Sequence, residues 1–359
     1  MDRTAKSPWW WIPTLYFAEG VPYFVVNVIS VTMFKRLGMS NADLAMYTSL
    51  LYLPWVIKPL WSPMVDVVRT KRWWVVVMQS LMTVAFALLA FSTPRTTGAP
   101  VSAFTFSLVV FYVTAMLSAT HDIAADGYYM LALDEHRQSL FVGIRSTFYR
   151  ISSVFGQGVI VVLAGVLETR LGDIPRAWKL TLLLCSLLFL LLSVWNLLFL
   201  PKVERSVPDT QRRSLTEAVT SFFRKPGVGI TLLFLLLYRL PEAFSVKMLT
   251  PFLLDPPEAG GLGLSTAQSG LVYGTVGVIA LTLGGILGGI YAGRKGLRRA
   301  LWPMSLSLAL PCAVYLFLSL AKGVSLPVIY ACVAFDQFGY GFGFTAYMLY
   351  MMYFSEGSY

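Results

Sequence analysis

Residues 118–130, with the sequence SATHDIAADGYYM, place ionisable side chains inside a run that is otherwise apolar from residue 103 to residue 133. A charged group at membrane depth costs at least about 2.5–3.5 kcal/mol, so such residues usually face a polar cavity and serve a transport or proton pathway. At helical spacing, four of the polar side chains share one face, namely Ser118, Asp122, Asp126 and Tyr129. We therefore expect a polar stripe that faces a cavity.

Asp122 and Asp126 lie one helical turn apart, so ionising both would bring like charges together in a medium of low dielectric constant. We expect one of them to keep its proton, as a proton-coupled carrier requires. Glu19, in the middle of the first apolar run, is a third candidate for proton coupling. The alternative is that both aspartates pair permanently with Arg145 or Arg150 and only hold helices together.

Other polar residues inside apolar runs are candidates for lining a substrate cavity: His121, Tyr129, Arg150, Gln157, Arg239, Glu242 and Asp336. His121 lies roughly 100° around the helix from Asp122, so it either reaches the cavity or bonds a neighbouring helix. Arg150 and Gln157 share a helical face, where the guanidinium can pair with a substrate carboxylate or with one of the aspartates.

Two features of the second half have both structural and functional interpretations. Arg239 and Glu242 are spaced for an intrahelical pair beside Pro241, with a structural or a gating role. Asp336 precedes glycines at 339, 341 and 343, which favour close packing or bending of a helix, although packing alone does not require the acid.

Composition identifies the elements that must position these groups. Hydrophobic residues make up 57% of the 359 residues, charged residues 13%, and the mean hydropathy is +0.67. A soluble protein carries about 25% charged residues, so the chain is an all-α integral membrane protein whose apolar runs are too continuous for barrel strands. We expect ten spans, at residues 9–34, 44–65, 73–91, 103–133, 141–167, 177–200, 228–254, 266–292, 301–320 and 326–354.

Three cysteines and two histidines provide neither a disulfide framework nor a metal centre, and no cofactor is implied. An enzyme built on His121 and Asp122 is disfavoured because neither a nucleophile motif nor a ligand cluster accompanies them. The sequence also leaves open a receptor that binds a ligand without transporting it.

Lysine and arginine concentrate in the loops on the same side as the N-terminus, which predicts a cytoplasmic N-terminus. The net charge of +10 arises in these loops and indicates contact with the bilayer surface rather than with nucleic acid. The spans hold ionisable residues of both signs, which predicts mutual pairing: Glu19, Lys58, Asp122, Asp126, Arg145, Arg150, Arg239, Glu242, Lys247 and Asp336.

The polar segment 201–227 divides the chain into residues 1–200, with six spans, and residues 228–359, with four. Within it, residues 214–223 can form an amphipathic helix at the membrane surface. Both halves begin with a proline-interrupted span carrying an acid, and both have a basic loop after their second span.

The loop that begins at Gly289 and contains Arg294 resembles the loop motif of major facilitator transporters, with Gly293 where aspartate is usual. The equivalent first-half loop, near Lys58, keeps Asp66 and Arg69. The resemblance implies a major facilitator fold of two six-helix bundles around a midplane site. Since that plan has twelve spans, we expect the C-terminal end to be truncated.

Five segments resemble one branch, the AmpG-type muropeptide permeases and acetyl-CoA transporters: KPLWSPMVD (58–66), THDIAADGYY (120–129), FYRISSVFGQG (148–158), LYRLPEAF (237–244) and FDQFGYGFG (335–343). The chain departs from the branch at His121, where glutamine is more frequent, and at Glu19, where small apolar residues are usual. The resemblance implies a monomeric, proton-coupled importer of anionic glycopeptides (anhydro-muropeptides for peptidoglycan recycling) in the bacterial inner membrane. A transporter of another organic anion, such as acetyl-CoA or a nucleotide-linked substrate, is the alternative.

Overall fold

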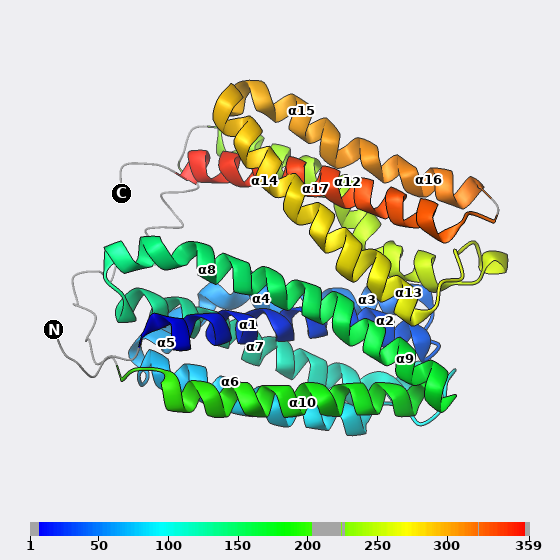
Figure 1. Ribbon diagram of the computed structural model, residues 1–359, viewed down its shortest axis with the longest axis horizontal. Helices are drawn as coiled ribbons and strands as arrows, with labels where there is room; N and C mark the ends of the chain where they lie inside the picture. The colour runs from blue at the N-terminus through cyan, green and yellow to red at the C-terminus, as the bar shows by residue number, and fades with distance from the viewer. Residues whose placement is uncertain (1–6, 203–223, 225–226, 322, 356–359) are drawn as a thin grey trace. The chain divides into compact units, whose positions relative to one another are not determined.

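A computed structural model describes residues 7–202, 224, 227–321 and 323–355, and all regular elements among these residues are helical (Figure 1). The chain divides into two compact units. The first unit comprises Met1–Arg205 and Leu264–Gly274, and the second comprises Ser206–Gly263 and Thr275–Tyr359. The predicted surface helix at residues 214–223 lies outside the described residues.

The first unit contains five of the six spans expected in the first half as long helices, and the second expected span as a series of short ones. Its elements are η1 (Pro8–Trp10), α1 (Ile12–Phe24), η2 (Val25–Ile29), α2 (Ser30–Arg36), α3 (Asn41–Leu50), α4 (Leu53–Ile57), η3 (Lys58–Leu60), α5 (Ser62–Val67), α6 (Lys71–Ser92), η4 (Val101–Phe104), α7 (Thr105–Ala132), α8 (Glu135–Val154), η5 (Phe155–Ile160), α9 (Val161–Leu171), α10 (Ile174–Phe199) and α13 (Thr266–Ser269). Helices α1 and α2 form one continuous span through the π-helical turn η2, as α8 and α9 do through η5.

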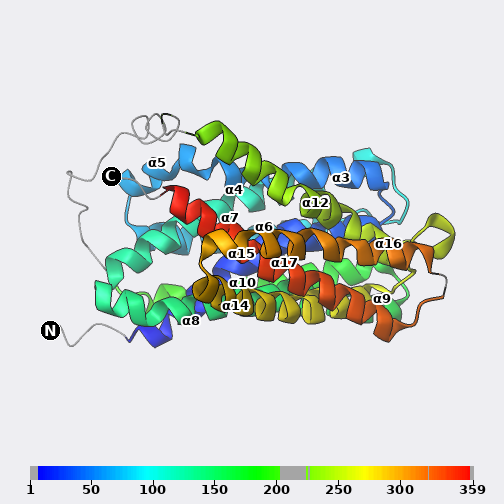
Figure 2. The same ribbon diagram turned by 90° about the horizontal axis from the view of Figure 1, so that it is seen from above.

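The second unit holds α12 (Val228–Leu254), η7 (Pro257–Ala259), α14 (Val278–Lys295), α15 (Leu297–Ala309), η9 (Leu310–Cys312), α16 (Ala313–Leu320) and α17 (Leu326–Ser355). The π-helical turn η8 (Gly270–Gly277) crosses the boundary between the units. Figure 2 shows that α15 and α16 follow one line beside α17.

The described residues contain eight helical segments long and apolar enough to cross a membrane. They correspond to eight of the ten expected spans, and the tenth expected span is α17. The second expected span, at residues 44–65, is broken into α3, α4, η3 and α5. Pro54, Pro59 and Pro63 explain the breaks, because proline lacks the N–H that a continuous helix needs.

Helix α1 lies at the centre of the first unit and packs against α7 and α8, while α6 packs against α7 and α10 (Figure 1). Most side chains of α1 are buried, including those of Tyr16 and Glu19. In the second unit, Gly341 of α17 lies against the backbone of Leu281 in α14, so that an added Cβ would overlap the Leu281 carbonyl. The glycines after Asp336 therefore permit the close helix packing predicted for them.

Glu168, in α9, joins four segments of the first unit. Its carboxylate pairs with Arg36 Nη2 at 3.0 Å and accepts hydrogen bonds from Trp178 Nε1 at 2.8 Å and Thr266 Oγ1 at 2.7 Å. The side chain is buried, so these partners compensate a charge that would otherwise be costly. The contact with Thr266 anchors α13 to the first unit.

The packing of α13 on α9 gives a first prediction. A Cβ at Gly165 would overlap the backbone of Ala267, so Gly165→Val should force the two helices apart. Overpacking of this kind costs about 1–3 kcal/mol, and the thermal melting temperature of the purified protein in detergent should fall. Gly143→Ala is the matched control, because a Cβ there meets nothing within 4 Å. A wild-type melting temperature for Gly165→Val would contradict the contact.

Candidate functional site

A cavity of about 530 Å³ lies within the first unit. Its walls come from α1, the broken second span, α7 and α8, and its lining residues are Tyr16, Glu19, Tyr23, Tyr52, Trp55, Lys58, Asp122, Val142, Arg145, Ser146 and Tyr149. Charged and aromatic side chains thus meet where an apolar core would be expected for helices of this composition.

Asp122 on α7 forms an ion pair with Lys58 on η3. The lysine side chain is 35% exposed and the aspartate side chain 17%, so the pair sits at the edge of the cavity, half-buried. The short helix α4, which contains Pro54, ends at Ile57. The 3-10 turn η3 follows it, beginning at Lys58 and containing Pro59. The break in the second span therefore brings a lysine to the aspartate stripe.

Asp126, one turn further along α7, pairs with Arg145 of α8. The Arg145 Nη2 atom lies 2.5 Å from Asp126 Oδ1, and the Tyr16 hydroxyl donates to the same oxygen at 3.3 Å. The guanidinium also lies over the Tyr16 ring, 4.5 Å from its centroid. These contacts tie α1, α7 and α8 together through one carboxylate.

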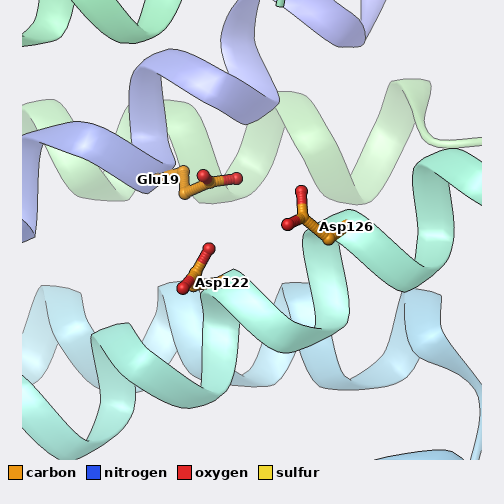
Figure 3. A group of neighbouring side chains, drawn as sticks. All are labelled: Glu19, Asp122 and Asp126. Carbon is orange, nitrogen blue, oxygen red and sulfur yellow. The ribbon is translucent and has the colours of Figure 1, made fainter. Parts of the chain in front are cut away.

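Glu19 of α1 completes a group of three carboxyls with Asp122 and Asp126, whose side chains point toward one another in Figure 3. Carboxylate oxygens of the three residues lie within 4.8 Å of one another. Glu19 is buried, and its Oε2 atom has no hydrogen-bond partner among the described residues. The three proton-coupling candidates named from the sequence therefore meet in space.

One wall of the cavity is aromatic. Tyr23 meets the Trp55 ring edge-on at 5.1 Å between centroids and the Tyr52 ring at 6.4 Å. Trp55 and Tyr52 are tilted by 30° at 6.3 Å. Such rings offer apolar faces beside the charged groups, a combination that suits an amphipathic organic ligand.

His121 lies on the other side of α7, fully buried. Its Nε2 atom lies 2.9 Å from Gln79 Nε2, and the Gln79 Oε1 atom accepts a hydrogen bond from Asn196 Nδ2 at 3.1 Å. Asn196 Oδ1 in turn accepts from the Thr14 hydroxyl at 3.0 Å. Of the two positions left open by the sequence, His121 takes the one against neighbouring helices, in a polar network joining α1, α6, α7 and α10.

The other first-unit candidates lie outside the cavity lining. Tyr129 is buried, donates its hydroxyl to the Gln138 carbonyl oxygen at 2.6 Å, and contacts the cluster only through its ring, 5.7 Å from Arg145. Arg150 is exposed, and Gln157 donates to the Ser153 hydroxyl at 2.9 Å within its own helix. Of the two arginines proposed as aspartate partners, Arg145 makes the pair seen with Asp126.

The second unit has a polar cluster of its own. Arg239 and Glu242 form the expected intrahelical pair, with Nη2 to Oε2 at 2.7 Å. Asp336 accepts hydrogen bonds from the Tyr315 hydroxyl at 2.8 Å and from Gln337 Nε2 at 3.0 Å. Glu242 and Asp336 line the same narrow crevice, so the acids singled out in this half also converge.

Most of the other residues of the two loop motifs lie at or beside helix ends. Asp66 is in the last turn of α5, and Arg69 has a left-handed backbone with φ of 64° and an exposed side chain. Gly289 lies within α14, where a Cβ would meet nothing within 4 Å, and Arg294 is exposed in the last turn of that helix.

The sequence pattern associates Lys58 with a loop motif and does not show that its side chain lines the cavity. The equal numbers of acidic and basic residues inside the spans did indicate that Lys58 has an acidic partner, but they did not show which one. Tyr23, Tyr52 and Trp55 were also missed, because aromatic residues in membrane helices usually pack or face lipid. Only the broken path of the second span reveals which of them share a cavity.

The family model of the Major Facilitator Superfamily matches residues 14–358. The chain belongs to this superfamily. It is 28% identical over 345 residues to the anhydromuropeptide permease of Escherichia coli K12, an alignment covering 94% of the chain and 66% of that relative. It is 23% identical over 357 residues to the putative transporter AmpG 4 of Rickettsia conorii, covering 91% of the chain and 80% of the relative.

Solved structures show the same major facilitator fold. A bacterial homologue of the human lysosomal transporter Spinster, in an inward-facing and occupied conformation, superposes with a TM-score of 0.64 at 17% identity, over 93% of the chain and 71% of that structure. The nucleoside transporter NupG gives 0.63 at 17% identity, over 94% and 79%. The all-α membrane fold and the resemblance to the AmpG-type branch are thus confirmed. The chain spans about two thirds of the length of the E. coli permease.

The Lys58–Asp122 pair gives a second prediction. Lys58→Met leaves a partly buried carboxylate without its cation and should lower the melting temperature, while adding Asp122→Asn should restore most of the loss. The cost should be below the about 3–5 kcal/mol of a fully buried pair, because the lysine is 35% exposed. Lys295→Met, at an exposed site, should be additive with Asp122→Asn. Additivity for the Lys58 variants as well would show that the pair does not form.

Proposed function

We propose that the protein is a secondary active transporter that imports anhydro-muropeptides together with protons. The observation that supports this best is a charged, aromatic-lined cavity on membrane-spanning helices, in a chain similar along 94% of its length to an anhydromuropeptide permease. We also propose that the protein works in a bacterial inner membrane as a monomer, with the N-terminus in the cytoplasm because lysine and arginine concentrate in the loops on that side.

The proton is assigned to the carboxyl cluster by its charge balance. Two of the three carboxyls in the cluster form ion pairs, Asp122 with Lys58 and Asp126 with Arg145. A third negative charge would be uncompensated at membrane depth, so one proton shared by the cluster makes it neutral. Rearrangement of either ion pair would change where that proton is best held, which couples proton movement to the state of the cavity.

The lining chemistry suits the substrate class. An anhydro-muropeptide combines sugar rings with a peptide that bears carboxylates. Arg145 and Lys58 offer cationic donors for carboxylates, and the Tyr23, Tyr52 and Trp55 rings offer flat apolar faces for sugars. The volume of about 530 Å³ lies within the usual range of pockets for organic ligands.

Uptake into proteoliposomes tests the proposal. Purified protein should import labelled N-acetylglucosaminyl-anhydro-N-acetylmuramyl peptide when an inward proton gradient is imposed, and a proton conductor should abolish the accumulation. Asp122→Asn and Asp126→Asn should each reduce the rate by at least about tenfold, because each leaves a cation without its partner in the cavity. Asp134→Asn, which alters an exposed helix cap, should transport normally.

Three outcomes would oppose the proposal. Absence of muropeptide uptake by folded, reconstituted wild-type protein would exclude this substrate. Full gradient-driven uptake by both aspartate variants would exclude the carboxyl cluster as the coupling site. Efficient uptake of labelled acetyl-CoA, with no competition from the muropeptide, would favour the organic-anion alternative.

A further inference from the structure

Glu19 carries a buried carboxyl oxygen that proton coupling alone does not explain. Its side chain is 8% exposed, and its Oε2 atom has no hydrogen-bond partner among the described residues. Asp122 and Asp126, by contrast, have a lysine and an arginine as partners. A buried oxygen without a partner is costly unless it binds something, so Glu19 Oε2 marks a position for a ligand.

The three carboxyls are spaced for an inorganic cation. One oxygen from each lies within 4.8 Å of the others, and the side chains converge from α1 and α7 on one point (Figure 3). Oxygens bind a Ca²⁺ ion at about 2.3–2.6 Å, so two ligands on opposite sides of such an ion are at most about 5 Å apart. Na⁺ has nearly the same radius as Ca²⁺ and also prefers oxygen ligands.

Charge decides the valence of the ion. With Glu19 ionised, the three carboxylates and the two cations that pair with them, Lys58 and Arg145, leave one negative charge without an ion pair. A monovalent cation makes the group neutral, whereas a divalent cation would leave an excess positive charge that is costly at membrane depth. A spacing within 4.8 Å is compatible with the distances at which Na⁺ binds oxygen.

We infer that Glu19, Asp122 and Asp126 form a Na⁺ site in which the ion takes the place of the shared proton. Glu19 supplies its unpartnered Oε2 atom. Asp122 and Asp126 each supply one carboxylate oxygen to the ion and keep their ion pairs with Lys58 and Arg145. The inference rests on the proposed function for the site and adds Na⁺ as a cation that competes there with the proton; binding of Na⁺ can be measured without substrate or transport.

Equilibrium binding of ²²Na⁺ to the purified protein in detergent tests the inference at constant pH and ionic strength. One Na⁺ should bind saturably per chain, unaffected by replacing N-methyl-D-glucamine with K⁺ as the balancing cation. Na⁺ should also raise the melting temperature saturably, because it binds the folded state. Glu19→Gln keeps the side-chain size but removes the charge, and should weaken Na⁺ binding by at least about tenfold.

Glu242→Gln is the matched control, since it alters a buried, ion-paired carboxyl in the second unit and should leave Na⁺ binding unchanged. Absence of saturable ²²Na⁺ binding by the wild-type protein would overturn the inference, as would equal displacement by K⁺. Wild-type affinity in a folded Glu19→Gln variant would also overturn it. Failure of muropeptide uptake with Na⁺ binding intact would oppose the proposed function and leave the ion site standing.

Discussion

The cost of an unbalanced charge at membrane depth governs the first unit of this protein. Helix α7 carries Asp122 and Asp126 on one face, and each is matched by a cation from a different element, Lys58 from η3 and Arg145 from α8. The ion pairs therefore do more than neutralise charge, because they connect α7 to α8 and to the η3 turn of the broken second span. Any movement that separates these helices must either break a pair or supply another partner, and this makes the cluster sensitive to the conformation of the unit.

Helix α7 also separates two polar networks of different character. The cavity side is ionic, whereas the opposite side holds the neutral chain of hydrogen bonds from His121 through Gln79 and Asn196. Adjacent residues on a helix point roughly 100° apart, so His121 and Asp122 enter different networks although they are neighbours in sequence. The neutral network stabilises the α6–α7–α10 packing without placing charge in the core. Ionic rearrangement can then occur on the cavity side while the back of the helix stays fixed.

The sequence predicted the fold well because membrane spans are encoded in long apolar runs, and prolines explain why the second span is broken into short helices. It also identified the three acids that meet in the carboxyl cluster beside the cavity, since an ionisable group inside such a run is conspicuous whatever its partners. The sequence did not show which cations pair with these acids. Lys58 opens the 3-10 turn η3, directly before Pro59, and neither the direction of its side chain nor its distance from Asp122 follows from helical periodicity. Two of the cavity aromatics, Tyr52 and Trp55, were unpredictable for the same reason, because they belong to the same broken span.

Glu19 is the position at which the chain departs most informatively from the AmpG-type pattern, which usually has small apolar residues there. With an apolar residue at position 19, the cavity would hold two carboxylates and two cations, and the group would be neutral with no bound ion. Glu19 adds one negative charge without adding a cation, and it does so with an oxygen that no described residue satisfies. The need for one monovalent cation therefore arises from this single side chain, while the ion pairs beneath it would persist without it. Cation dependence and helix cohesion are thus separable properties of one cavity.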